Sequence, residues 1–184
     1  MKFSAFHGLV AGISLAALLG AAPAFAATQG TAGSTSTGSV TITLTIPNLV
    51  RISGLTDITM PVWDGSSNIA GTSNACVWSS TRKYRITPTG SGSGSAFTLA
   101  DGSTPTPNTI AYTVEWAQSS GASSGTAATS GTALTGQTSS ATSSTCSGGT
   151  NSTVIVRITA AALAAAPAAG TNYTGTLTLL VAPE

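Results

Sequence analysis

The segment "GSVTITLTIPN", residues 38–48, carries the clearest structural pattern of this chain. Its apolar and hydroxyl side chains alternate, which is the pattern of a β-strand with one buried face. Pro47 ends the alternation, because proline lacks the N–H group that a strand interior needs. The face to be buried carries Val40, Ile42, Leu44 and Ile46. The pattern does not decide whether this strand belongs to the sheet of its own chain or to the sheet of a second molecule.

The residues before this strand fall into two parts. Residues 1–26 combine a positive charge at Lys2, an apolar stretch too short for a membrane span and an "APAFA" end, which predicts a signal peptide cleaved after Ala26. Residues 27–38 contain only Ala, Thr, Gln, Gly and Ser, which bury too little apolar surface to fold. We therefore expect an exported chain in which residues 27–48 form a flexible leader and the N-terminal strand.

Residues 49–184 have the pattern of one all-β domain. Short apolar or alternating runs are separated by turns rich in Gly, Pro, Ser and Thr, which favours an antiparallel sandwich. The expected strands lie within 49–55, 76–78, 84–87, 96–99, 110–116, 154–158 and 177–181. The segment "AALAAAPAA", residues 161–169, predicts at most one helical turn because Pro167 interrupts it. Residues 118–149 are too long for a structureless loop, so we expect weak edge strands there, held by Cys146.

Charge and cysteine content limit the partners of the exported chain. After residue 26 the acidic and basic side chains are equal in number, so neither nucleic acid nor an anionic membrane has an electrostatic reason to bind. The same neutrality gives little repulsion between copies, so self-association is tolerated. Two cysteines in an exported chain, Cys76 and Cys146, predict one disulfide. The loop of about 70 residues that it closes corresponds to roughly 4 kcal/mol in the chain-entropy model.

The residues that most enzymes use are missing. The one histidine, His7, lies in the predicted signal peptide, which excludes a Ser–His or Cys–His nucleophile and the usual zinc sites from the exported chain. Asp57 and Asp64 could form a glycosidase pair, but Asp64 lies in "WDGSSN", which is typical of a turn. We therefore expect a protein that is not an enzyme and that holds neither a metal nor a cofactor.

Two groups of side chains could still bind a ligand. The basic run "RKYR", residues 82–85, is interpreted as a solvated strand edge, with an anionic glycan site as the alternative. Trp63, Trp78 and Trp116 could stack on sugars, although tryptophans are more often core residues. Trp116 ends an alternating strand and is the one that we expect in the core.

The two ends of the chain resemble a known family. The closing stretch "GTNYTGTLTLLVAPE", residues 170–184, is a final strand entered through "YTG". Together with the signal peptide and the alternating strand before Pro47, it resembles the major subunits of chaperone–usher fimbriae. Its "YTGTLTLLV" is also similar to the end of spore coat protein U domains, and "YTVEW", residues 112–116, fits the middle of the fimbrial family. The cysteines depart from the family, because many members place the first one closer to the first strand or have none.

The resemblance implies an incomplete immunoglobulin-like sandwich that is completed by donor strand exchange. In that family a periplasmic chaperone fills the gap first, and the N-terminal strand of the next subunit replaces it at an outer-membrane usher. Carried over to this chain, the donor strand would present Val40, Ile42, Leu44 and Ile46. The edge that meets the chaperone and the usher would present Tyr173, Leu177, Leu179 and Val181.

These expectations lead to a prediction of function. The chain is predicted to be a structural subunit of a bacterial surface fimbria that supports adhesion or biofilm formation, exported through the periplasm to the cell surface. Its partners would be identical or related pilin subunits, the chaperone and the usher, with a host or surface glycan as a further partner. The alternative is a secreted, self-complete β-sandwich that binds carbohydrate. Whether the N-terminal strand acts on its own domain or on another copy stays open at this point.

Overall fold

The computed structural model describes residues 26–168 and 172–184. The chain divides into two units, Met1–Ile46 and Pro47–Glu184. The predicted signal peptide lies outside the described residues except for Ala26. No helix in the described part of the chain is long and apolar enough to cross a membrane.

The described part of the first unit is extended and exposed. Thr28 and Ser39 form an isolated antiparallel bridge with main-chain N–H···O distances of 2.9 and 3.0 Å, so the polar leader turns back on itself. Residues 40–46 form no strand, because the described structure gives them no ladder partner. Their alternating apolar side chains are 72–89% exposed, at Val40, Ile42, Leu44 and Ile46.

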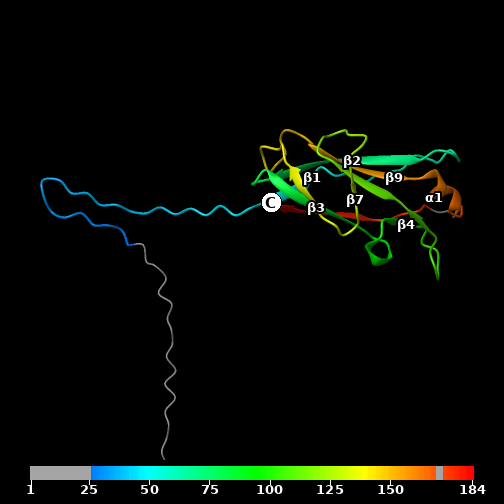
Figure 1. Cartoon of the computed structure of the whole chain (residues 1–184), viewed down its shortest axis with the longest axis horizontal. Helices are drawn as coiled ribbons and strands as arrows, with labels where there is room; N and C mark the ends of the chain where they lie inside the picture. Colours follow the sequence, from blue (N-terminus) through cyan, green and yellow to red (C-terminus); the bar gives the residue numbers. More distant parts are fainter. Residues whose placement is uncertain (1–25, 169–171) are drawn as a thin grey trace, which may run out of the picture. The chain divides into compact units, whose positions relative to one another are not determined.

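The second unit is an antiparallel β-sandwich, as predicted (Figure 1). Its five-stranded sheet has the order β1 (Val50–Ser53), β2 (Ile69–Ser79), β9 (Ser152–Ile158), β6 (Thr113–Ala117) and β7 (Thr126–Ala128). The three-stranded sheet has the order β10 (Leu177–Pro183), β3 (Lys83–Gly90) and β8 (Leu134–Thr138). β4 (Thr98–Ala100) and β5 (Thr109–Ala111) form a further pair. The short helix α1 (Ala160–Ala165) is capped by Thr159, whose hydroxyl accepts from the Ala162 N–H at 3.2 Å.

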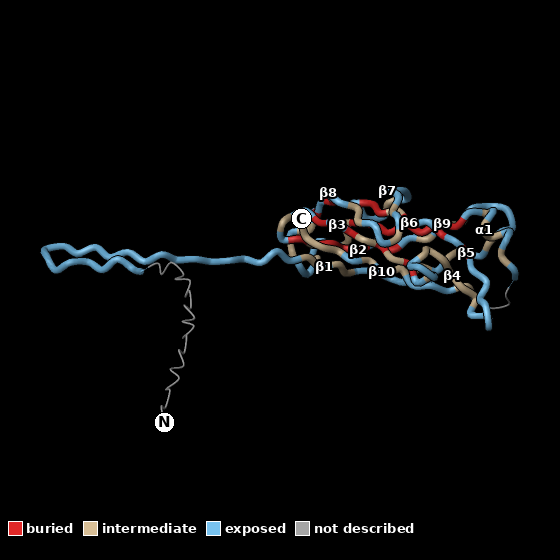
Figure 2. Tube along the Cα trace, turned by 60° about the horizontal axis from the view of Figure 1, so that its bottom comes forward, coloured by how far each residue is buried: buried red, intermediate tan, exposed pale blue. Residues whose placement is uncertain are grey.

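The core lies between the two large sheets, and the buried parts of the chain are concentrated in their strands (Figure 2). Tyr84 of β3 and Trp116 of β6 meet there, and the Trp116 indole N–H donates to the Tyr84 hydroxyl at 3.1 Å. This confirms Trp116 as a core residue. The remaining core is aliphatic or aromatic, at Ala75, Val77, Ile86, Ile110, Tyr112, Val114, Val154, Val156 and Ile158.

The predicted disulfide is present and joins Cys76 to Cys146, whose Cα atoms are 6.2 Å apart. It connects β2 to the loop between β8 and β9 across a sequence separation of 70 residues. The long tract that precedes Cys146 contains the short strands β7 and β8, which confirms the prediction of weak strands between residues 118 and 149.

Several predicted elements differ in extent from the observed strands. Residues 110–116 form two strands, because β5 pairs with β4, β6 pairs with β9, and the Tyr112 N–H between them bonds to the Phe97 carbonyl at 2.9 Å. The strand expected within residues 84–87 extends to Gly90 in β3, and Pro88, beyond the expected end, is buried there. The prediction that "RKYR" lies on a strand edge is wrong, because β3 is the middle strand of its sheet and Arg82 precedes it in a turn.

Candidate functional site

A groove of about 910 Å³ runs between the two sheets of the second unit on the open side of β10. Its floor consists of core side chains from β5, β9 and the residue after β5, namely Ile110, Tyr112, Val154, Val156 and Ile158. Leu177 and Leu179 of β10 form one wall, and residues 55–63, here called the lip, form the other. The groove is therefore mainly apolar and is lined by the same residues that build the core.

The β10 wall is the edge of the three-stranded sheet. β10 pairs antiparallel with β3 from Leu177 opposite Gly90 to Pro183 opposite Tyr84. In the described part of the chain no strand pairs with its other edge, where alternate main-chain N–H and C=O groups point away from β3. Such an edge can accept a further strand. Leu177 and Leu179 face the groove, whereas Leu180 on the outer face is 64% exposed.

The lip lies along β2 without joining the sheet. Ile58 and Met60 of the lip pack against the core, and Gly71 of β2 makes this approach possible because a Cβ there would collide with both side chains. In the described structure the main chain of residues 55–68 makes no main-chain hydrogen bond. It is held instead by the Thr56 N–H, which donates to the Ser73 hydroxyl at 2.8 Å. The lip thus has free backbone groups to offer to a strand placed beside it.

The groove has the chemistry of a strand-binding site. Its two walls offer unpaired backbone groups and its floor offers apolar contacts, which are the two requirements of β-strand addition. The titratable groups at the groove do not suggest acid–base chemistry. Burial raises the pKa of the Tyr112 hydroxyl, and desolvation together with the Asp101 charge raises the pKa of Tyr173. Both phenols therefore stay neutral at physiological pH.

The structure brings together most of the residues that sequence reasoning assigned to the C-terminal edge. Tyr173, Leu177 and Leu179 line the groove, and the Tyr173 hydroxyl donates to the Pro167 carbonyl at 2.8 Å. Val181 lies further along β10 and packs against the core outside the groove. The residues predicted for the donor strand belong to the other unit.

Sequence reasoning missed the lip. Residues 58–63 are not among the expected strands, although Ile58 and Met60 are two positions apart and both pack against the core. Trp63 stands at the end of the lip, and its indole N–H donates to the Ser67 carbonyl at 2.9 Å. This alternation next to a turn was the signal that could have identified a segment packed along the sheet.

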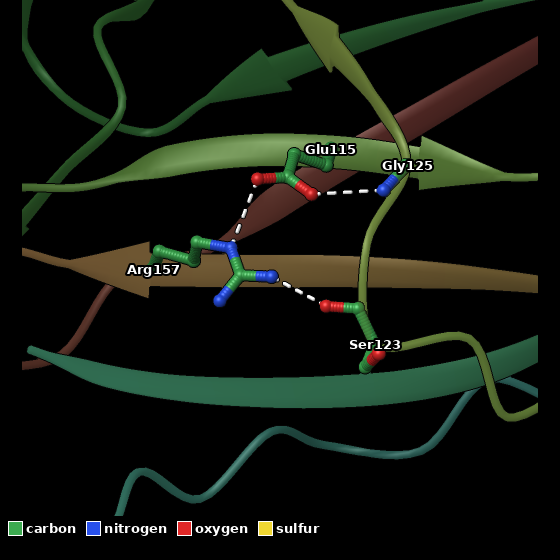
Figure 3. A network of polar contacts seen from close by, with 4 residues as sticks. All are labelled: Glu115, Ser123, Gly125 and Arg157. Atoms are coloured by element: carbon green, nitrogen blue, oxygen red, sulfur yellow. Dashed lines mark hydrogen bonds and ion pairs between the residues drawn. The ribbon is translucent and has the colours of Figure 1, made fainter.

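Glu115 and Arg157 form an ion pair with a structural role (Figure 3). The Arg157 Nε donates to Glu115 Oε1 at 2.9 Å, and Gly125 N donates to Oε2 at 2.9 Å. Arg157 also donates to the Ser123 carbonyl. The bond from Arg157 lowers the pKa of Glu115. The pair therefore holds the loop between β6 and β7 against β9.

Asp64 forms the turn that the sequence predicted. Its carboxylate accepts from the main-chain N–H groups of Ser66 and Ser67, both at 2.8 Å. These bonds, with that of Ser67 the largest, hold the pKa of Asp64 far below its usual range. The residue is thus engaged as a turn acceptor rather than as a general acid.

Comparison with known proteins gives a distant likeness among solved structures and none among family models or curated sequences. No protein-family model matches the chain, and no curated protein sequence matches it. Among solved structures, a chain of a chaperone–tip adhesin complex described as vital for the activation of CFA/I fimbriae biogenesis is similar, with a TM-score of 0.46 and 17% identity. The similarity covers 73% of this chain, which spans 41% of that chain.

Proposed function

We propose that this protein is a structural subunit of a bacterial surface fimbria and polymerises by strand addition. Residues 40–46 of one copy would occupy the groove beside β10 of another copy. The observation that carries the proposal is the presence, in one chain, of an unpaired strand edge over an apolar groove and of an exposed alternating segment. The resemblance of the two chain ends to chaperone–usher subunits supports a chaperone and an usher as assembly partners.

The alternating segment matches the groove in spacing and chemistry. In a strand, side chains two residues apart lie on one face about 7 Å from each other, so the apolar residues of 40–46 would follow the groove side by side. Full burial of a Val, Leu or Ile side chain contributes about 1.5–3 kcal/mol, so four of them offer roughly 6–12 kcal/mol before the cost of association. Thr41, Thr43 and Thr45 would face outward.

The attachment point of the leader supports a donor from another copy. Two hydrogen bonds join Leu49 to Ser80. The Leu49 N–H donates to the Ser80 Oγ at 2.8 Å, and the Ser80 N–H donates to the Leu49 carbonyl at 2.9 Å. This is the end of the sandwich where β1 begins and β10 finishes. The groove lies in the other half, between the lip and Tyr173. To reach the groove of their own domain, residues 40–46 would have to enter it from the end of the sandwich that β1 and β10 close. A segment from another copy does not have this constraint.

The test is a charge placed on one face of the segment. Leu44→Asp would bury an unpaired carboxylate in the groove of the neighbour, which costs several kcal/mol. We expect this variant to keep its circular dichroism spectrum and to elute as a monomer when the wild-type chain forms multimers. Thr43→Asp, with the same charge on the opposite face, is the matched control and should still form multimers.

The two other outcomes have distinct meanings. An unfolded Leu44→Asp monomer would show that the segment completes its own domain. A Leu44→Asp chain that forms multimers as the wild type does would contradict strand addition by this segment. Size-exclusion chromatography with light scattering and circular dichroism separates these results.

A further inference from the structure

Four exposed cations gather at one end of the sandwich. Arg82 lies in the turn between β2 and β3, and Lys83 and Arg85 follow in β3. Arg51 of β1 lies opposite Trp78, next to the same turn. This end, here called the cationic end, also contains the end of β10, where the Glu184 N–H bonds to the Lys83 carbonyl at 3.2 Å. Glu184 is the one carboxylate side chain described at this end, so a positive excess remains.

Two carboxylates lie at the opposite end, here called the acidic end. Asp64 is in the turn before β2. The Asn68 side-chain oxygen, at the end of this turn, accepts from the Ala160 N–H of α1 at 2.8 Å. Asp101 follows β4, where Ala100 bridges to Thr174 ahead of β10. Hydrogen bonds, first that of the Ser103 N–H, lower the pKa of Asp101 to about 2, so its carboxylate is ionised at neutral pH.

The length of β2 separates these two ends. The strand has 11 residues, which corresponds to about 35 Å in an extended chain. Figure 2 shows β1, β3 and the C-terminus at one end of the sandwich and α1, β4 and β5 at the other. Asp57 lies between the ends next to Thr56, and Glu115 and Arg157 neutralise each other. The neutral exported chain is thus polarised along its strands.

We infer that consecutive copies in the fibre meet with the cationic end of one on the acidic end of the next. This inference rests on the proposed function, and the partner is a second copy of this chain. The leader joins the sandwich at the cationic end, beside Ser80, whereas the groove opens toward the acidic end, between Trp63, Leu163 and Tyr173. When residues 40–46 of a donor subunit are bound in the groove of an acceptor subunit, the sandwich of the donor follows directly after Pro47. The donor sandwich must therefore meet the acceptor subunit at one end of the acceptor.

The charges decide which end is met. A segment bound antiparallel to β10 would bring its Ile46 end out at the acidic end, because β10 runs from the acidic end to the cationic end. The cationic end of the donor subunit follows immediately after Pro47 and would face the carboxylates at the acidic end of the acceptor subunit. A parallel segment would bring two cationic ends together, where like charges oppose each other. Such attraction mainly speeds association and weakens with salt.

Lys83 makes the contact directly testable. It is the one lysine after residue 26, so a carbodiimide that couples amines to carboxylates in contact has one side-chain amine to use. In wild-type multimers we expect an amide between Lys83 and Asp64 or Asp101, found by mass spectrometry. Since these residues lie at opposite ends of one sandwich, the product must join two copies. Multimers in which Lys83 couples only to Glu184 would overturn the inference.

A kinetic test uses variants with equal changes of net charge. Lys83→Gln/Arg85→Gln removes two cations from the cationic end, whereas Thr72→Glu/Thr132→Glu adds two anions at exposed positions away from both ends. At about 20 mM salt we expect the first variant to form multimers about tenfold more slowly than the wild type, with the difference gone near 0.5 M. The second variant should keep the wild-type rate within about twofold.

The outcomes separate this inference from the proposed function. Equal rates for Lys83→Gln/Arg85→Gln and the wild type at low salt would overturn the charged junction. The proposed function would still stand if Leu44→Asp abolished the multimers in the same assay. Multimers formed normally by Leu44→Asp would contradict the proposed function itself.

Discussion

At the scale of single residues, the Tyr84 hydroxyl links the two sheets inside the core. It accepts from the Trp116 indole at 3.1 Å and lies 3.5 Å from the Ser152 hydroxyl, and burial raises its pKa. Tyr84→Phe would leave the Trp116 N–H without an acceptor, which costs about 1–3 kcal/mol of unfolding free energy. Urea unfolding measures this loss. Tyr112→Phe, also in the core, is the control and should lose less, and equal losses would contradict a special role for the Tyr84 hydroxyl.

Asp101 gives the protein a predictable response to acid. Its pKa is lowered from 3.8 to about 2 in the folded chain, first by the Ser103 N–H. The stabilisation that the ionised Asp101 carboxylate gives to the folded chain is therefore fully present above about pH 4. It is lost as the pH falls through about 2. We expect Asp101→Asn, which keeps an acceptor oxygen, to show a shallower loss of unfolding free energy over this range. Parallel curves for the two proteins from pH 7 to 2 would contradict this assignment.

At the scale of elements, the disulfide fixes a tract that has little core of its own. It joins β2 to the loop after β8, and Asn151 beyond that loop pairs with Val77 through both its amide oxygen and its amide nitrogen at 2.9 Å. Cys76→Ala/Cys146→Ala should lower the unfolding free energy by about 4 kcal/mol, as expected for a loop of this length. Denaturant unfolding checks the value. A loss below about 1 kcal/mol would show that the loop holds its place without the bridge.

Elements with a clear alternation were predictable from the sequence, and elements with polar inward positions were not. β6 and β10 carry the alternation, β9 is a short continuous apolar run, and all three were predicted within a few residues. β2 was predicted only in part, because its N-terminal half contains Ser73 and Asn74, whose side chains are satisfied by hydrogen bonds to Thr56 and Thr153. Such partners come from distant segments and leave no local signal. The lip does carry a local signal in the alternation of Ile58 and Met60, but only the position of β2 shows what these side chains pack against.

At the scale of the whole molecule, folding creates a charge separation that the linear sequence does not show. The run at residues 82–85 is visible in the sequence, but only the pairing of β1 with β2 adds Arg51 to it. The acidic end likewise joins Asp64 and Asp101 from separate loops. The apolar residues of the C-terminal edge were predictable because β10 alternates, whereas the groove needs the lip and the floor as well.

A subunit in the proposed fibre has two independent ends, one that donates residues 40–46 and one that accepts them. Leu44→Asp should lose only the donor function, and Leu179→Arg, in the groove wall, should lose only the acceptor function. Each variant alone should stay monomeric, and an equimolar mixture should form a one-to-one dimer that grows no further, as measured by light scattering. Thr178→Arg, on the exposed face of β10, is the control and should still polymerise. A mixture that stays monomeric while both variants remain folded would contradict donor and acceptor roles for these two segments.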